Sequence, residues 1–146
     1  MSVSFINKLF KSKSNDDFCT AVVLAAGNSQ RMGKDKILMP LGGAPVIAHT
    51  LKALQSAECI DEIVVVTKYE RLQELADICH DHGISKASKV VVGGKTRLES
   101  SLIGVSNADE RAKYIAIHDG ARPFVTNSLI AVSYTHLRAH ETVLDL

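Results

Sequence analysis

The sequence predicts an α/β fold, a Rossmann-like and mostly parallel β-sheet with helices on both faces. Short apolar runs of strand length alternate along the chain with segments whose apolar residues recur at helical spacing. Repeated units of this kind are typical of parallel strands joined by crossover helices. The 146 residues, 46% of them hydrophobic, suffice for one domain around one sizeable core.

Four segments are expected to be the strands of this sheet. The first is the near-continuous apolar run CTAVVLA at residues 19–25, which is typical of a strand buried on both faces. Three later runs rich in valine and isoleucine follow at 63–66, 89–92 and 114–117.

Helices are expected between these strands. Pro45 suits the first turn of a helix that extends to about Glu58. Apolar spacing predicts a second helix over residues 69–82, with Gly83 as its C-cap. Thr96 is expected to cap a third helix, and Thr126 or Asn127 a fourth. The apolar residues that the third helix carries are Leu98, Leu102 and Val105.

Charge and cysteine content narrow the class of protein. The net charge of +1 gives no global basic field of the kind that points to nucleic acid. No apolar run approaches the ~20 residues that a membrane-spanning helix needs. The three cysteines, Cys19, Cys59 and Cys79, lie far apart without metal-ligand spacing, so we interpret them as reduced packing residues. We therefore expect a cytoplasmic protein without a nucleic-acid or membrane partner.

The segment AAGNSQRMGKDK, residues 25–36, follows the first strand and is predicted to bind an anion. Ala25, Ala26 and Gly27 have little or no side chain, so backbone N–H groups there can approach a ligand closely. Three cations of the segment are able to neutralise a polyphosphate: Arg31, Lys34 and Lys36. The alternative is a polar surface turn with solvated cations, and spacing alone does not separate the two interpretations.

A second glycine-bearing loop, GGKTRLESS at residues 93–101, follows the third strand. Two glycines followed by hydroxyl side chains suit close approach to a base or a ribose. The plainer alternative is a strand-to-helix turn with a helix cap.

The third loop, HDGARP at residues 118–123, follows the fourth strand. Its carboxylate, Asp119, could hold Mg²⁺ beside a phosphate site because this ion prefers oxygen ligands. Arg122 could bind phosphate or pair with Asp119. Ligands of parallel sheets bind where strands give way to loops at their carboxyl ends, so the three loops are expected to form one composite site.

Together these segments resemble the nucleotidyltransferases that join a CTP-derived nucleotide to a sugar or polyol phosphate. The resemblance is to the 2-C-methyl-D-erythritol 4-phosphate cytidylyltransferase family, and it covers roughly residues 19–130. It is carried by three motifs in order: AAG…RM…K followed by PLGG at residues 25–43, GGxxRxxS at 93–100, and HDGARP at 118–123.

The resemblance implies the nucleotide-diphosphosugar transferase fold and a metal-assisted transfer from CTP, with release of pyrophosphate. It implies that Arg31 and Lys36 are the catalytic cations, with Lys34 the alternative lysine, and that Asp119 holds Mg²⁺ or another divalent cation. The residues that it places at the nucleotide are Ala25, Ala26, Gly27, Gly94, Ser100, Gly120 and Arg122. It further implies a polyol phosphate as the second substrate and a homodimer for the full-length form.

The pattern breaks after residue 131. We divide the chain into an N-terminal extension (1–17), a partial nucleotidyltransferase domain (18–131) and a tail (132–146). The family is longer and continues with an arm used in dimerisation and acceptor binding, whereas the tail VSYTHLRAHETVLDL does not look like that continuation. We expect a stretch foreign to the family, such as a translated sequencing adapter. The alternative is a genuine final helix with Leu137 and Leu144 on one face.

Two other functions remain open from the sequence. One is a sister enzyme, of the ribitol-phosphate or molybdenum-cofactor nucleotidyltransferase type. The other is an inactive, nucleotide-binding fragment, which the missing acceptor half favours.

Overall fold

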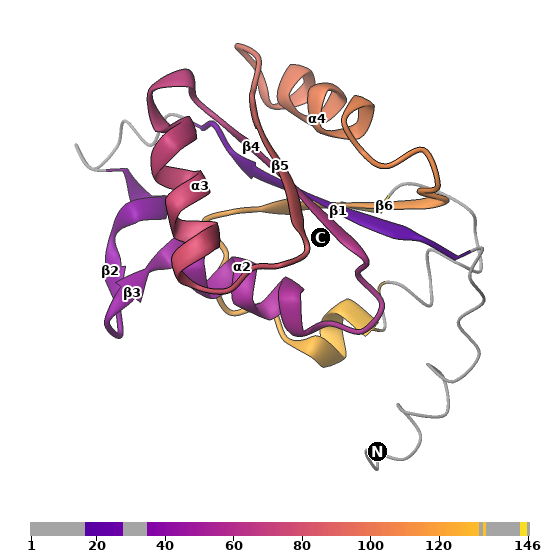
Figure 1. Cartoon of the computed structure of the whole chain (residues 1–146), viewed down its shortest axis with the longest axis horizontal. Helices are drawn as coiled ribbons and strands as arrows, with labels where there is room; N and C mark the ends of the chain where they lie inside the picture. The colour runs from indigo at the N-terminus through magenta and orange to yellow at the C-terminus, as the bar shows by residue number, and fades with distance from the viewer. Residues whose placement is uncertain (1–16, 28–34, 132, 134–143, 146) are drawn as a thin grey trace.

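The computed structural model describes residues 17–27, 35–131, 133 and 144–145, and confirms the predicted α/β fold. Its centre is a sheet of five parallel strands in the order β5-β4-β1-β6-β7 (Figure 1). The strands are β1 (Cys19–Ala25), β4 (Glu62–Thr67), β5 (Ala87–Val92), β6 (Tyr114–Asp119) and β7 (Leu144–Asp145).

β1 is the strand on which the sheet is built, because it pairs with β4 on one side and β6 on the other. Ala21 faces Ile63 of β4 and Ala116 of β6 across these two pairings. The side chains of β1 and β4 are buried at nearly every position, as the apolar runs predict.

Two long helices cover one face of the sheet and one covers the other (Figure 1). α2 (Val46–Ser56) and α3 (Leu72–Asp81) contribute to a single core with alternate residues of β1 and β4. α3 is preceded by the short 3₁₀ turn η3 (Tyr69–Arg71) and followed by Gly83, whose φ of +68° fits the predicted C-cap. A last turn, over residues 127–131, begins at Thr126, whose Oγ1 accepts the N–H of Leu129 at 3.1 Å.

α4 (Arg97–Ser106) lies on the opposite face, and two of the three apolar residues expected to form its buried side, Leu98 and Leu102, are exposed. Leu98 and Leu102 are 69% and 60% exposed, whereas Ser101 and Gly104 are buried. A Cβ on Gly104 would overlap a methyl group of Val22, so the small residues let the helix approach the sheet closely. The predicted cap is confirmed, since the Oγ1 of Thr96 accepts the N–H of Glu99.

Two small features were not predicted. A hairpin pairs β2 (Pro40–Leu41) with β3 (Ala44–Pro45) around Gly42 and Gly43, whose φ values of +56° and +85° suit glycine. Strands of two residues are too short to show a period in the sequence.

The second feature is β7, which lies within the tail. Leu144 pairs with Ala116 of β6 in the parallel sheet, so the alternative of a final helix is wrong at this residue. The domain boundary at residue 131 stays a prediction. Among the described residues, no helix combines the length and the apolar character needed to cross a membrane.

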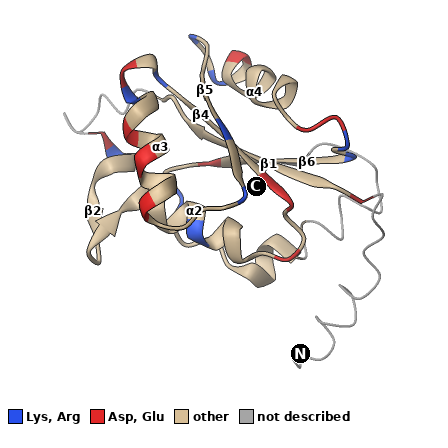
Figure 2. Ribbon diagram, in the orientation of Figure 1, with Lys and Arg blue, Asp and Glu red and all other residues tan. Residues whose placement is uncertain are grey.

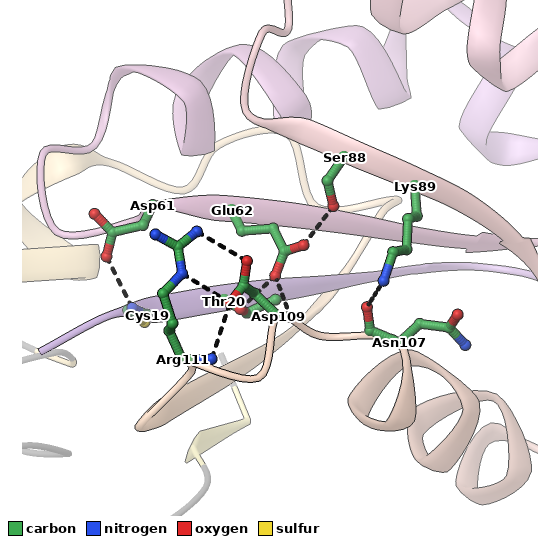
Figure 3. Close-up of polar contacts among 9 residues, drawn as sticks. All are labelled: Cys19, Thr20, Asp61, Glu62, Ser88, Lys89, Asn107, Asp109 and Arg111. Atoms are coloured by element: carbon green, nitrogen blue, oxygen red, sulfur yellow. Dashed lines mark hydrogen bonds and ion pairs between the residues drawn. The ribbon is translucent and has the colours of Figure 1, made fainter. Parts of the chain in front are cut away.

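Glu62 joins four elements at the amino ends of the strands (Figure 3). Its side chain is 5% exposed and accepts hydrogen bonds from Thr20 Oγ1 at 2.7 Å, Ser88 Oγ at 2.5 Å and the N–H of Asp109 at 2.8 Å. The donors lie on β1, on β5 and on the loop before β6, so this buried carboxylate links the starts of β1, β4 and β5 to that loop.

Further polar contacts extend this cluster (Figure 3). Asp61 accepts the N–H of Cys19 at 2.8 Å, and Lys89 donates to the carbonyl of Asn107 at the end of α4. Arg111 donates two side-chain hydrogen bonds and one backbone hydrogen bond to Asp109. These bonds hold the pKa of the Asp109 carboxyl well below its usual range.

Removing the Glu62 carboxylate is expected to destabilise the sheet. Glu62→Ala leaves the buried hydroxyl of Thr20 and the partly buried N–H of Asp109 without an acceptor, which costs about 2–4 kcal/mol of unfolding free energy. Glu62→Gln keeps the shape and most of the hydrogen bonds, so it should cost only about 1 kcal/mol. Urea unfolding followed by circular dichroism measures both values, and equal stabilities for the two variants would contradict the role given to the carboxylate.

Candidate functional site

The carboxyl ends of β1, β4, β5 and β6 meet at one edge of the sheet. Leu24 is level with Asp119 of β6, and Thr67 is level with Ala25 on one side and Val92 on the other. The three predicted loops leave the sheet at this edge and enclose a cavity of about 450 Å³. Its lining residues are Leu24, Ala25, Ala26, Gly27, Asp35, Lys36, Ile37, Gly94, Lys95, Thr96, Arg97, Ser100, Asp119 and Ala121.

The first loop contributes small residues and one lysine to the cavity. Ala25 is buried at the end of β1, and its carbonyl accepts a hydrogen bond from Thr67 Oγ1 at 3.4 Å. Residues 28–34 lie outside the described part of the chain. The roles expected of Arg31 and Lys34 therefore stay predictions. Lys36 opens the 3₁₀ turn η2 (Lys36–Leu38), which is anchored in the core by Ile37.

The second loop is folded tightly against α4. The N–H of Gly94 donates to Ser100 Oγ at 3.2 Å, and the N–H of Lys95 donates to Glu99 Oε2 at 2.6 Å. A Cβ on Gly94 would overlap Glu99, so glycine is needed where the loop turns back on the helix. Ser100 is 4% exposed and lines the cavity. Because its hydroxyl accepts the N–H of Gly94, it also stabilises the conformation of the loop.

The third loop places a carboxylate at the cavity. Asp119 is the last residue of β6, and its Oδ1 accepts the N–H of Ala121 at 2.9 Å. Arg122 Nε lies 4.0 Å from Asp119 Oδ2, and the arginine side chain is 70% exposed. The ring of His118 is buried, and its Nε2 contacts the carbonyl of Arg122 at 3.2 Å, which fixes the turn.

Gly120 is a packing position behind the cavity. Its N–H donates to the carbonyl of Leu24 at 2.9 Å, and its own carbonyl accepts from Thr50 Oγ1 at 2.8 Å. A Cβ there would lie 2.7 Å from Ile47 Cδ1 and 3.0 Å from the Leu24 carbonyl oxygen. Neither Gly120 nor Arg122 lines the cavity, and their roles at the nucleotide stay predictions.

The structure thus brings together most of the predicted site residues that it describes. Those lining the cavity are Ala25, Ala26, Gly27, Lys36, Gly94, Ser100 and Asp119. Asp35 and Ile37 were missed. Asp35 carried a signal, since aspartate is a common N-cap and its Oδ1 accepts the N–H of Ile37 at 3.4 Å.

The charge at the cavity is local. Lys36, Lys95 and Arg97 line it together with Asp35 and Asp119, while over the rest of the ribbon charges of both signs are dispersed (Figure 2). Three cations around small side chains and backbone N–H groups favour a polyanionic ligand. A larger hollow, of about 690 Å³, lies between α3 and β5, but no predicted site residue lines it.

Asp119 fits a magnesium ion that is bound mainly through substrate. Within the described ranges, no group of three or more His, Cys, Asp or Glu forms a metal cage. Mg²⁺ is commonly held by one or two carboxylates together with substrate phosphates and water, and Asp119 supplies one such carboxylate, 46% exposed, at the cavity.

The chain is similar to known proteins over most of its length. The family model of IspD, 2-C-methyl-D-erythritol 4-phosphate cytidylyltransferase, matches residues 19–144. The chain belongs to this family. The cytidylyltransferase of Halalkalibacterium halodurans is 36% identical over 128 residues, which are 86% of this chain and 56% of the relative. That of Clostridium tetani is 37% identical over 113 residues, 76% of this chain and 46% of the relative.

Solved structures of the family share the fold. The 4-diphosphocytidyl-2C-methyl-D-erythritol synthase of Anaerococcus prevotii superposes with a TM-score of 0.72 at 26% identity, covering 85% of this chain and 52% of that one. The chain therefore spans about half the length of the cytidylyltransferases that it matches.

Gly120→Ala is expected to destabilise the chain, because the added methyl group meets the Leu24 carbonyl, which cannot move without disturbing β1. The cost should be about 1–3 kcal/mol of unfolding free energy. Gly27→Ala is the matched control, since no atom of the described residues lies within 4 Å of a Cβ at Gly27 and the stability of this variant should not fall. Thermal unfolding of both variants checks this, and an unchanged Gly120→Ala would contradict the packing.

Proposed function

We propose that the chain carries the nucleotide-binding half of an enzyme that transfers a cytidylyl group from CTP to 2-C-methyl-D-erythritol 4-phosphate. The observation that carries the proposal is the convergence of the three motif-bearing loops on one cavity lined by small residues and cations. Membership of the cytidylyltransferase family supports the choice of CTP and of this acceptor.

In the proposed reaction, a phosphate oxygen of the acceptor attacks the α-phosphorus of CTP. A new P–O bond forms to the acceptor phosphate, and the bond from the α-phosphorus to its bridging oxygen breaks, so pyrophosphate leaves with the electron pair. Such a transfer needs neutralisation of developing charge more than it needs an acid or a base. Lys36 at the cavity and Arg31 are the residues we assign to this neutralisation.

Asp119 is the residue that would hold Mg²⁺. The ion would supply positive charge to the phosphate oxygens, which lowers the repulsion between the two anionic substrates. The N–H of Ala121 donates to Asp119 Oδ1 and so orients the carboxylate, while Oδ2 lies 4.0 Å from Arg122 Nε.

A second candidate is nucleotide binding without transfer. It would use the same cavity and the same cations and differ only in the step on the acceptor. The chain spans about half the length of the relatives that it matches. A transferase of the ribitol-phosphate or molybdenum-cofactor type would use the same cavity with another acceptor or base. We place the protein in the cytoplasm, which agrees with the reduced, buried thiols of Cys19, Cys59 and Cys79.

Lys36→Ala is expected to weaken the binding of CTP and, where turnover occurs, to lower pyrophosphate release by about a hundredfold, because a cation at the phosphates is lost. Lys52→Ala, which changes an exposed lysine on α2, is the control and should match the wild type. Calorimetric titration with CTP and Mg²⁺ and a pyrophosphate assay with the acceptor measure both steps. Wild-type behaviour of Lys36→Ala in both would remove this role.

Asp119→Asn should abolish the gain in CTP affinity that Mg²⁺ gives the wild type, because an amide is a poor ligand for a hard cation. The comparison is the dissociation constant for CTP with Mg²⁺ and with EDTA, for both proteins. Asp109→Asn, at the opposite edge of the sheet, is the control. An unchanged magnesium dependence in Asp119→Asn would place the metal elsewhere.

A further inference from the structure

Arg71 does not line the cavity, but it contacts a residue that does. It ends η3, the turn that follows β4, and its Nε donates to Asp35 Oδ2 at 2.9 Å. Asp35 belongs to the segment that follows β1 and lies at the wall of the cavity. The ion pair therefore ties together two loops that leave neighbouring strands at the same edge of the sheet.

The pair is better placed than an ordinary surface ion pair. The side chains of Arg71 and Asp35 are 27% and 16% exposed, so solvent screens them only in part. Arg71 is held on its other side by Glu74 Oε2 at 3.0 Å. This second carboxylate is 50% exposed and does not line the cavity.

Asp35 in turn organises the turn that carries Lys36. One carboxylate oxygen accepts the N–H of Ile37, and the other accepts from Arg71. Ile37 is 6% exposed and packs in the core. The backbone of Lys36 is therefore held on one side by Ile37 and on the other by Asp35, which the ion pair with Arg71 fixes. Loss of the ion pair would free one end of this turn.

The ion pair between Arg71 and Asp35 also changes the charge at the cavity. Two of the described residues that line the cavity are acidic, Asp35 and Asp119. Asp119 has a proposed partner in the metal ion, whereas a bare carboxylate at Asp35 would repel a triphosphate. Arg71, which lies outside the cavity, neutralises the negative charge of Asp35 through the ion pair.

We propose that Arg71 is a positioning residue of the nucleotide site, which acts through its ion pair with Asp35. The pair cancels a carboxylate charge beside the triphosphate and holds the turn from which Lys36 enters the cavity. The inference rests on the proposed function, because it requires a polyanionic ligand in this cavity.

The test is a comparison of ligands that differ in charge. Arg71→Gln should raise the dissociation constant for CTP about tenfold and leave that for cytidine unchanged, since the lost cation acts on the charge of the ligand. Asp35→Asn in the Arg71→Gln background should restore most of the CTP affinity. Calorimetry serves for CTP and NMR titration for cytidine, and thermal melts confirm that each variant is folded.

Two controls isolate the pair. Glu74→Gln removes the other partner of Arg71 and should bind CTP as the wild type does. Arg71→Lys keeps the positive charge and should lie between the wild type and Arg71→Gln, which preserves the test if the glutamine variant does not fold.

Three results would overturn the inference. These are an unchanged CTP affinity in Arg71→Gln, an equal loss for CTP and cytidine, and no recovery in the double variant. If the wild type itself binds no CTP, the proposed function fails and takes the inference with it. If the wild type binds CTP and Arg71→Gln binds equally well, only the inference fails.

Discussion

The parallel pairing of β1 with β4 on one side and with β6 on the other is the constraint on which the structure depends. Parallel strands send all their carboxyl ends to one edge, so the loops that follow β1, β5 and β6 meet there although they are far apart in the sequence. The opposite edge is closed by the buried carboxylate of Glu62. Hydrogen bonds to Glu62 thus stabilise the amino ends of the strands, and the cavity lies at their carboxyl ends.

The second determinant of the site is the small size of its residues. Ala25, Ala26, Gly27 and Gly94 line the cavity with at most a methyl side chain, and Gly94 has no room for a Cβ because Glu99 packs against it. Backbone groups can therefore approach whatever occupies the cavity. Five charged residues line it as well: Asp35, Lys36, Lys95, Arg97 and Asp119. This arrangement suits a ligand whose charge is concentrated in phosphates.

The strands and the site loops could be predicted from the sequence because their signals are local. A buried parallel strand reads as an apolar run, and glycines and charges directly after it mark a loop at the ligand-binding edge. The orientation of α4 could not be predicted in this way. Leu98 and Leu102 give the helix an apolar stripe, but close packing against Val22 selects the small residues for the buried side. The Arg71–Asp35 pair was missed because it depends on how two loops approach one another in the fold, and the spacing of residues in the sequence does not indicate this.

The most direct test of this account is NMR mapping of CTP and Mg²⁺ on the isotope-labelled chain. Amide shifts are expected to change at residues 25–27, 35–37, 94–97 and 119–121, the three loops that form the cavity. Shift changes confined to the hollow between α3 and β5, or no changes at millimolar CTP, would contradict it.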